Sequence, residues 1–131
     1  MSQENVDLVT GGYDEFNRGD IQALTARFHP EIEWNEPGGG NAPSGTFTGP
    51  DSVAGDVFAT VPQNFDEFSC TVEEASDQGD TVVVKARFNG RSKSGTELDT
   101  KAEHVWRVRD GKIARFENNL DDPDAWASAW S

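Results

Sequence analysis

A histidine stands in a row of apolar residues in the last third of the chain. Between residues 98 and 108, apolar or small side chains alternate with charged ones, and His104 belongs to the same set as Trp106. Because a period of two is typical of a half-buried β-strand, His104 is expected to face the interior. A buried imidazole can be purely structural and donate to a backbone carbonyl. It gains a functional meaning where other ionisable groups face the same interior.

Two carboxylates are candidates for that interior. Glu36 alternates with Trp34 on the apolar side of an earlier strand, and Asp121 directly follows the last predicted strand. Desolvation raises the pKa of a carboxylate and lowers that of a histidine, which brings both toward neutrality, where general acid–base catalysis is most effective. Glu36, His104 and Asp121 are therefore the candidate catalytic residues. The alternatives are that Glu36 is a hydrated carboxylate at a loop edge and that Asp121 or Asp122 caps the terminal helix.

Aromatic residues accompany these groups along the sequence. Most belong to a hydrophobic core, yet several must line any cavity, and they suit a flat or ring-bearing ligand. The candidate ligand-binding residues are Tyr13, Phe16, Trp34, Phe58, Phe88, Trp106, Phe116 and Asn118. No carboxylate spacing resembles a calcium loop and the two histidines form no zinc motif, so we predict neither a metal nor a cofactor.

The N-terminal half predicts helices and one strand. Apolar residues at steps of three and four predict a helix around residues 6–16 and a second short helix, capped by Asp20 and ended by Pro30. The period changes to two over residues 31–36, which predicts a strand. A glycine-rich loop follows, and Pro50 is well placed as the first residue of a third helix.

The C-terminal half predicts a sheet. Alternating apolar residues beyond Pro62 predict four long strands, with a tight turn at Asp110-Gly111 before the last, and a short helix follows Asp122. This order predicts an α+β fold with a cone-shaped, strongly curved, mixed or antiparallel sheet. Three helices of the N-terminal half pack on its concave face, and the open end is a natural small-molecule pocket. The 131 residues contain no internal repeat, so we predict one domain spanning 1–131.

Charge narrows the range of partners. The chain has 24 acidic and 11 basic residues and a formal net charge of −13, which repels nucleic acids and anionic membranes. No apolar run approaches the ~20 residues of a membrane span, and the N-terminus lacks the pattern of a signal peptide. We expect a soluble, cytoplasmic protein. Its single cysteine, Cys70, excludes an internal disulfide.

Charged residues also occupy the outward positions of the predicted strands, among them Lys85, Arg87, Glu103 and Arg107. This face can be simply solvated, but opposite charges also suit a polar interface between two copies. We predict a homodimer that forms through the outer face of the sheet.

Three segments give the chain a family resemblance. Residues 16–21 (FNRGDI), 28–34 (FHPEIEW) and above all 104–113 (HVWRVRDGKI) resemble the SnoaL-like proteins of the ketosteroid isomerase and nuclear transport factor 2-like superfamily. The resemblance covers nearly everything from Val6 to Trp130. It implies the cystatin-like, nuclear transport factor 2-like roll, but the superfamily contains several enzyme classes and non-catalytic members, so the fold does not name the reaction.

The resemblance selects the same three residues. Glu36 falls at the place of the catalytic aspartate of the isomerases, and His104 lies on the strand that carries their oxyanion donor. Asp121 falls at the place of the acid/base aspartate of the SnoaL-like cyclases. The isomerase tyrosine, in contrast, falls at Gly12, and the adjacent Tyr13 is expected to project about 100° around the helix from that direction.

Two functions fit these residues. The first is a cofactor-free enzyme that removes a proton next to the carbonyl of a small, largely apolar compound, followed by isomerisation, cyclisation or dehydration. Glu36 or Asp121 is then the base, and His104 donates to the developing enolate oxygen or relays the proton. The second is a non-catalytic protein that binds a hydrophobic metabolite and uses His104 as one orienting hydrogen bond.

Overall fold

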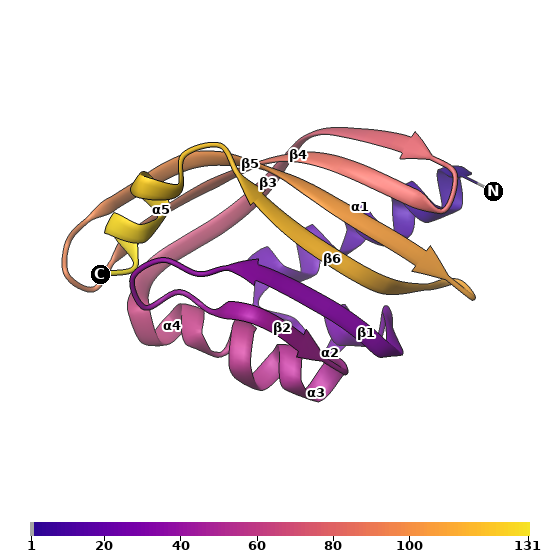
Figure 1. The fold of residues 1–131 in the computed structure, drawn as a ribbon, viewed down its shortest axis with the longest axis horizontal. Coiled ribbons are helices and arrows are strands. Elements are labelled where there is room, and N and C mark those ends of the chain that lie inside the picture. The colour runs from indigo at the N-terminus through magenta and orange to yellow at the C-terminus, as the bar shows by residue number, and fades with distance from the viewer. Residues whose placement is uncertain (1) are drawn as a thin grey trace.

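Six strands form the frame of the fold in the computed structural model, which describes residues 2–131 (Figure 1). They are β1 (Phe28–Pro37), β2 (Ser44–Thr48), β3 (Phe65–Gln78), β4 (Thr81–Ser92), β5 (Glu97–Arg109) and β6 (Lys112–Leu120). Their order across the sheet is β2-β1-β6-β5-β4-β3, and all neighbours are antiparallel except β1 and β6, which run parallel. The sheet is therefore mixed and open, with β2 and β3 at its edges.

Helices lie against the concave side of this sheet (Figure 1). The elements are α1 (Ser2–Arg18), α2 (Ile21–Thr25), α3 (Pro50–Val53), the π-helical turn η1 (Ala54–Phe58), α4 (Thr60–Asn64) and α5 (Pro123–Ala129). The third predicted helix is thus divided into three short pieces. Within residues 2–131, no helix has the length and apolar character needed to cross a bilayer. The predicted α+β class and the packing of the helices are confirmed.

The predicted helix starts are also confirmed. Oδ1 of Asp20 accepts a hydrogen bond from the backbone N–H of Ala23 at 3.2 Å and caps α2. Oδ1 of Asp122 does the same for Ala125 at 3.1 Å and caps α5. Pro50 is the first residue of α3, where its missing N–H has no intrahelical partner to lose.

Two segments differ from the prediction. Phe28, expected on the second helix, is the first residue of β1. Pro30 is tolerated inside that strand because the pairing of β1 with β6 shifts register between Phe28 and Glu33 and requires no N–H there. Strand β2 forms at residues 44–48, partly within the stretch expected to be a loop.

Hydrogen bonds and a close approach hold α1 in place over the sheet. The carboxamide of Asn17 donates to the backbone oxygen of Cys70 and accepts from its N–H, both at 2.9 Å. Arg27 donates to both carboxylate oxygens of the buried Glu15, at 2.6 and 3.1 Å. A Cβ at Gly11 would lie 2.8 Å from Nη2 of Arg27, so the glycine allows the guanidinium to lie against the helix.

Strand β5 shows the alternation that the sequence predicts. Its side chains at residues 98, 100, 102, 104, 106 and 108 are buried, and those between them are exposed or half-buried. His104 is 3% exposed and faces the helices together with Trp106. The inward orientation of the histidine is therefore confirmed.

Candidate functional site

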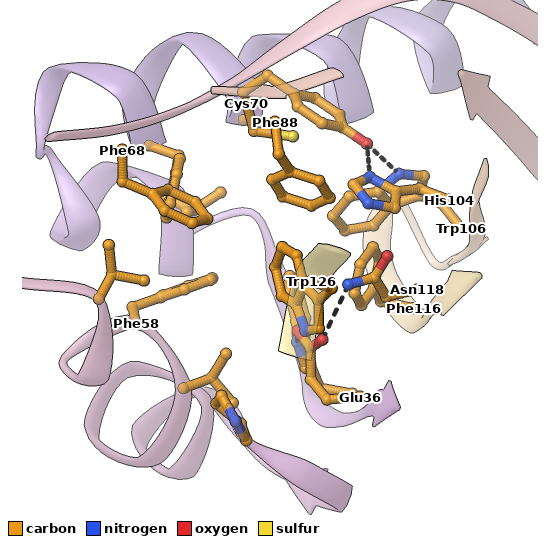
Figure 2. Close-up of a pocket in the computed structure, with 18 of the residues that line it drawn as sticks. Glu36, Phe58, Phe68, Cys70, Phe88, His104, Trp106, Phe116, Asn118 and Trp126 are labelled. Atoms are coloured by element: carbon orange, nitrogen blue, oxygen red, sulfur yellow. Dashed lines mark hydrogen bonds between the residues drawn. The ribbon is translucent and has the colours of Figure 1, made fainter. Parts of the chain in front are cut away.

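A cavity of about 80 Å³ lies between the concave face of the sheet and the helices. Aromatic side chains make up most of its wall (Figure 2). The eight candidate ligand-binding residues all line it: Tyr13, Phe16, Trp34, Phe58, Phe88, Trp106, Phe116 and Asn118. The candidate catalytic residues Glu36 and His104 also line it.

The rings pack tightly at the sheet side of the cavity. Phe116 stacks on Trp34 with ring centroids 4.0 Å apart, and its centroid lies 4.4 Å from that of Trp106 and 4.9 Å from that of His104. On the helix side, Phe58 of the π-helical turn packs edge-on against Trp34 at 5.2 Å. Such interlocked rings form a rigid, apolar wall suited to a flat ligand.

The proton on His104 can be assigned from its neighbours. The indole Nε1–H of Trp106, which can only donate, donates to Oη of Tyr13 at 2.9 Å. Tyr13 Oη lies 2.6 Å from Nδ1 of His104, and its hydroxyl hydrogen finds no other acceptor among residues 2–131. Nδ1 therefore accepts this hydrogen, and the neutral imidazole carries its own proton on Nε2.

Burial keeps that imidazole neutral. Desolvation lowers the pKa of His104 from 6.5 to about 3, and a hydrogen bond with Asn118 offsets this only in part. At physiological pH the ring is therefore a hydrogen-bond donor through Nε2–H and carries no positive charge. Burial likewise raises the pKa of Tyr13 well above its usual value, so its hydroxyl stays protonated.

Glu36 lies near the end of β1, half-buried, with its carboxylate held from two sides. Nε1–H of Trp34 donates to Oε2 at 2.7 Å and the Nδ2 amide of Asn118 donates to Oε1 at 3.0 Å. Desolvation raises the pKa of Glu36 from 4.5 to about 7, although both hydrogen bonds act to lower it. The carboxylate thus exchanges a proton near neutrality, as a general acid or base must.

Asn118 connects these groups across the sheet. It lies directly opposite His104 in the pairing of β5 with β6, and its carboxamide lies between His104 and Glu36 (Figure 2). Its Nδ2 donates to Oε1 of Glu36, and its Oδ1 lies on the side of His104 (Figure 2). The position of Asn118 in the cavity follows from its strand pattern, but its hydrogen bond to Glu36 requires the parallel pairing of β1 with β6, which the sequence does not reveal.

The structure does not bring Asp121 to this cavity. Its side chain is exposed, and its backbone N–H is bonded to the carbonyl of Lys101 at 3.0 Å on the neighbouring strand. The reason is the period of the strand, because Phe116 and Asn118 face inward and residue 121 has the opposite parity. The expectation that Asp121 faces the pocket must therefore be corrected.

The structure adds several lining residues that the sequence did not single out. Gly12 lines the cavity beside Tyr13, which was itself a candidate and whose hydroxyl lies 2.6 Å from Nδ1 of His104. Trp126 of α5 and Trp130, the residue that follows this helix, also line the cavity, and their four-residue spacing was the available signal. Phe68 and Cys70 of β3 also contribute to the wall. Among residues 2–131, no three His, Cys, Asp or Glu side chains cluster so that they could share a metal ion.

Comparison with known proteins now adds the family. The sequence pattern of the SnoaL-like domain matches residues 9–116. This chain belongs to the SnoaL-like family. An uncharacterized protein of Mycobacterium tuberculosis is 30% identical to the domain over 127 residues, which are 97% of this chain and 96% of that protein.

Solved structures resemble this SnoaL-like domain closely. An NTF2-like protein from Burkholderia thailandensis has a TM-score of 0.89 and 30% identity, and the match covers 97% of both chains. The structure of TerC, co-crystallized with polyporic acid, has a TM-score of 0.82 and 30% identity over 90% of this chain and 92% of TerC. The fold is therefore the nuclear transport factor 2-like roll that the resemblance implied.

The polar groups of the SnoaL-like domain form one line through an aromatic cavity. Trp106, Tyr13 and His104 make up one end, and Trp34 and Glu36 make up the other, with Asn118 between them (Figure 2). The line offers one titratable carboxylate and one neutral N–H donor. Such a pair can move a proton at carbon and stabilise the negative charge that develops on a neighbouring oxygen.

Proposed function

We propose that this SnoaL-like domain is a cofactor-free acid–base enzyme for a small, largely apolar, ring-bearing carbonyl compound. The observation that carries the proposal is the Glu36 carboxylate, whose pKa of about 7 arises from its burial among aromatic rings. A carboxylate used only for solubility or ion pairing has no need of such surroundings. Perturbed ionisable groups of this kind concentrate in active sites.

In the proposed step, Glu36 removes a proton from the carbon next to the carbonyl group. The C–H electron pair becomes the C=C bond, and the carbonyl π pair moves onto the oxygen. That oxygen accepts a hydrogen bond from Nε2–H of His104, which stays neutral because burial lowers its pKa to about 3. Return of the proton to another carbon completes an isomerisation, whereas attack on a second carbonyl or loss of a leaving group gives cyclisation or dehydration.

Tyr13 and Asn118 are positioning residues in this proposal. Tyr13 fixes the tautomer of His104 by donating to Nδ1 at 2.6 Å, so that Nε2–H faces the substrate. Asn118 holds one oxygen of Glu36 at 3.0 Å, and the other oxygen is held by Trp34 at 2.7 Å. Asp121 has no role here because its side chain is exposed.

The test is the exchange of the α-protons of cyclohexanone in deuterium oxide, followed by proton NMR. The domain is expected to accelerate exchange over buffer, and Glu36→Gln is expected to lower the protein-dependent rate by about 10²- to 10⁴-fold. Glu103→Gln is the matched control, since Glu103 is an exposed carboxylate on the other face of β5. A Glu36→Gln rate equal to the unsubstituted one contradicts the proposal.

The alternative is a non-catalytic protein that binds a hydrophobic metabolite. It is favoured by the two hydrogen bonds that already occupy both oxygens of Glu36. The co-crystallization of TerC with polyporic acid fits ligand binding under either function. Saturable binding of cyclohexanone without any exchange above buffer would support the binder and exclude the enzyme.

We also propose that the domain forms a homodimer through the outer face of the sheet. Support comes from exposed, oppositely charged side chains on neighbouring strands, such as Arg87 and Asp99, which lie 2.8 Å apart. Sedimentation equilibrium tests the assembly, and reversing the charge of Arg87 and Lys101 together is expected to weaken it. A monomer at all concentrations overturns this proposal.

A further inference from the structure

A second hollow adjoins the cavity and is lined by the end of α1, the start of α2, η1, α4 and β3. We call it the outer groove. It has a volume of about 580 Å³, and the side chains of Phe16, Phe58, Val61 and Phe68 line both the groove and the cavity. The ring centroids of Phe16 and Phe58 are 5.7 Å apart, and those of Phe16 and Phe68 are 5.9 Å apart. Because the same four side chains line both spaces, the two spaces are neighbours separated by side chains.

The cavity alone is small for a ring-bearing ligand. Its volume is about 80 Å³, whereas an apolar cavity that takes up benzene measures about 150 Å³. On the sheet side, Trp34 and Phe116 stack with centroids 4.0 Å apart, which leaves no space between them. On the side of the outer groove, Phe16, Val61 and Phe68 are only half-buried. A ligand therefore gains its additional space most easily toward the outer groove.

The wall of the outer groove is mainly apolar. Ile21 and Ala59 line it together with the four shared side chains. Asn17 lines it too, but its carboxamide is already bonded to the backbone N–H and carbonyl of Cys70. Among residues 2–131, Arg18 is the one charged residue in this wall, and its side chain is 61% exposed. A hydrocarbon chain suits such a wall, because it buries apolar surface without leaving a polar group of the ligand unpaired.

The outer groove adjoins the end of the cavity that is remote from the polar groups. Phe58 and Phe68 lie on the side of the cavity opposite His104 and Asn118 (Figure 2). A ring whose carbonyl oxygen lies beside His104 therefore turns its opposite carbon toward the groove. A chain on that carbon extends between the shared side chains, whereas a chain next to the carbonyl meets the aromatic wall of the cavity.

We propose that the outer groove is the second half of the ligand site and takes an apolar chain attached to the ring opposite the carbonyl. This inference rests on the proposed function, which places the carbonyl beside His104. The ligand class is then ring ketones with an alkyl or alkenyl chain rather than bare rings. The shared wall carries the assignment, because a chain that leaves the cavity on this side enters the groove.

The test compares two isomers of pentylcyclohexanone by titration calorimetry. One isomer has the pentyl chain on the carbon opposite the carbonyl, and the other has it on the carbon next to the carbonyl. The two have the same composition and nearly the same hydrophobicity, so a difference in affinity reports the position of the chain. The opposite isomer is expected to bind at least about tenfold more tightly, because its methylene groups are buried in the groove. Equal affinities, or no binding of either isomer, overturn the inference.

A variant that fills the groove assigns the preference to it. Ala59 lines the groove but not the cavity, so Ala59→Trp is expected to reduce the affinity ratio of the two isomers to about one and to leave cyclohexanone binding unchanged. Ala26→Trp is the matched control. Ala26 is exposed, lines neither space and has nearly the same backbone conformation, with φ −64° and ψ −20° against φ −66° and ψ −21° at Ala59. A ratio that stays high in Ala59→Trp contradicts the inference.

The outcome is separable from the enzyme proposal. Affinity for the isomers is measured without turnover, and cyclohexanone exchange is measured without a chain on the probe. A preference for the opposite isomer with no exchange above buffer overturns the enzyme and leaves the groove as a ligand site. Exchange that depends on Glu36, with equal affinity for the isomers, overturns the groove and leaves the enzyme. If Ala59→Trp changes sedimentation equilibrium and not the ratio, a second copy covers the groove, and the inference is again overturned.

Discussion

The two faces of strand β5 differ in how far their polar groups are exposed to water. The outer face carries Lys101 and Glu103 among exposed charges, and Lys101 pairs with Glu73 at 3.2 Å. The inner face carries His104, and burial lowers the pKa of this residue to about 3. Glu36 of β1 lines the same cavity half-buried, and burial raises its pKa to about 7. The outer face holds many more charges, yet the inner groups His104 and Glu36 have pKa values that burial moves far from their ordinary values. Desolvation distinguishes these inner groups from the outer charges.

The ion pair between Arg87 and Asp99 shows how a pKa shift on the outer face differs from the shift of Glu36. Arg87 donates to both oxygens of Asp99 at 2.8 Å, and the hydrogen bond from Arg87 lowers the pKa of Asp99. Such a shift keeps an exposed carboxylate ionised, the state it already has in water. It therefore changes nothing near neutrality, whereas the shift of Glu36 moves its titration into the physiological range.

The largest expected difference between the faces is in the pH dependence of cyclohexanone proton exchange. With Glu36 as the base, the rate is expected to rise about 100-fold between pH 5 and pH 8 and to level off above pH 7. His104 stays neutral throughout this range because its pKa is about 3. Proton NMR at low cyclohexanone concentration measures the profile. Half-maximal exchange near pH 4.5 would show that Glu36 behaves like an outer carboxylate.

The next expected difference is in how much a buried and an exposed hydroxyl contribute to the free energy of unfolding. Tyr13→Phe is expected to lower the free energy of unfolding by about 2 kcal/mol, because Nε1–H of Trp106 and Nδ1 of His104 lose their shared partner. The control on the exposed side is Thr46→Val, which removes an exposed hydroxyl that donates to Asn35, and it is expected to change stability by less than about 0.5 kcal/mol. Urea unfolding followed by circular dichroism compares the two. Similar losses in the free energy of unfolding for both variants would contradict the expected difference between the buried and the exposed hydroxyl.

A smaller effect is expected in the pH dependence of stability. Because folding raises the pKa of Glu36 from 4.5 to about 7, the folded chain holds a proton that the unfolded chain releases between these values. Lowering the pH from 7.5 to 6 therefore stabilises the native protein, by about 1 kcal/mol through this group.

Glu36→Gln is expected to lack this gain when urea unfolding is measured at both pH values. Below pH 6.5, His104 lowers the stability of the native protein, since its imidazole binds a proton in the unfolded chain but not in the folded chain. That loss is common to both proteins and cancels in their difference. Parallel stability curves for the two proteins would show that Glu36 is not desolvated in solution.

The smallest effect is expected on the outer face. The double substitution Arg87→Gln and Asp99→Asn removes an exposed ion pair, and such pairs contribute little once both partners are hydrated and screened by salt. At a protein concentration low enough to keep the chain monomeric, the thermal midpoint at physiological salt is expected to stay the same within measurement error. At a concentration at which the proposed dimer forms, the outer face is covered and the double substitution is expected to lower the midpoint.

Sequence patterns predicted most of the fold because alternation is strong where a strand buries one face. Strands β4 and β5 have this pattern along their whole length. Strand β2 escaped prediction because it is a short edge strand held mainly by its backbone pairing with β1, and among its residues only Phe47 is partly buried. Phe28 was misplaced because a residue between a helix and a strand fits both periods.

The candidate site was predictable to the same extent. The inward direction of His104 and Asn118 follows from period two alone, and the same rule places Asp121 outside. The hydrogen bond from Asn118 to Glu36 was not predictable, since it depends on the parallel register that sets Trp34 beside Phe116. Register between strands distant in the chain is not recorded in local spacing.

The aromatic wall has a consequence for how the protein can be observed. The chain contains four tryptophans and one tyrosine, and all five line the cavity. Its near-ultraviolet absorption and its intrinsic fluorescence therefore arise almost entirely from the surface that a ligand touches. The unlabelled protein is thus an optical sensor of its own cavity, and a library of compounds can be screened by emission alone.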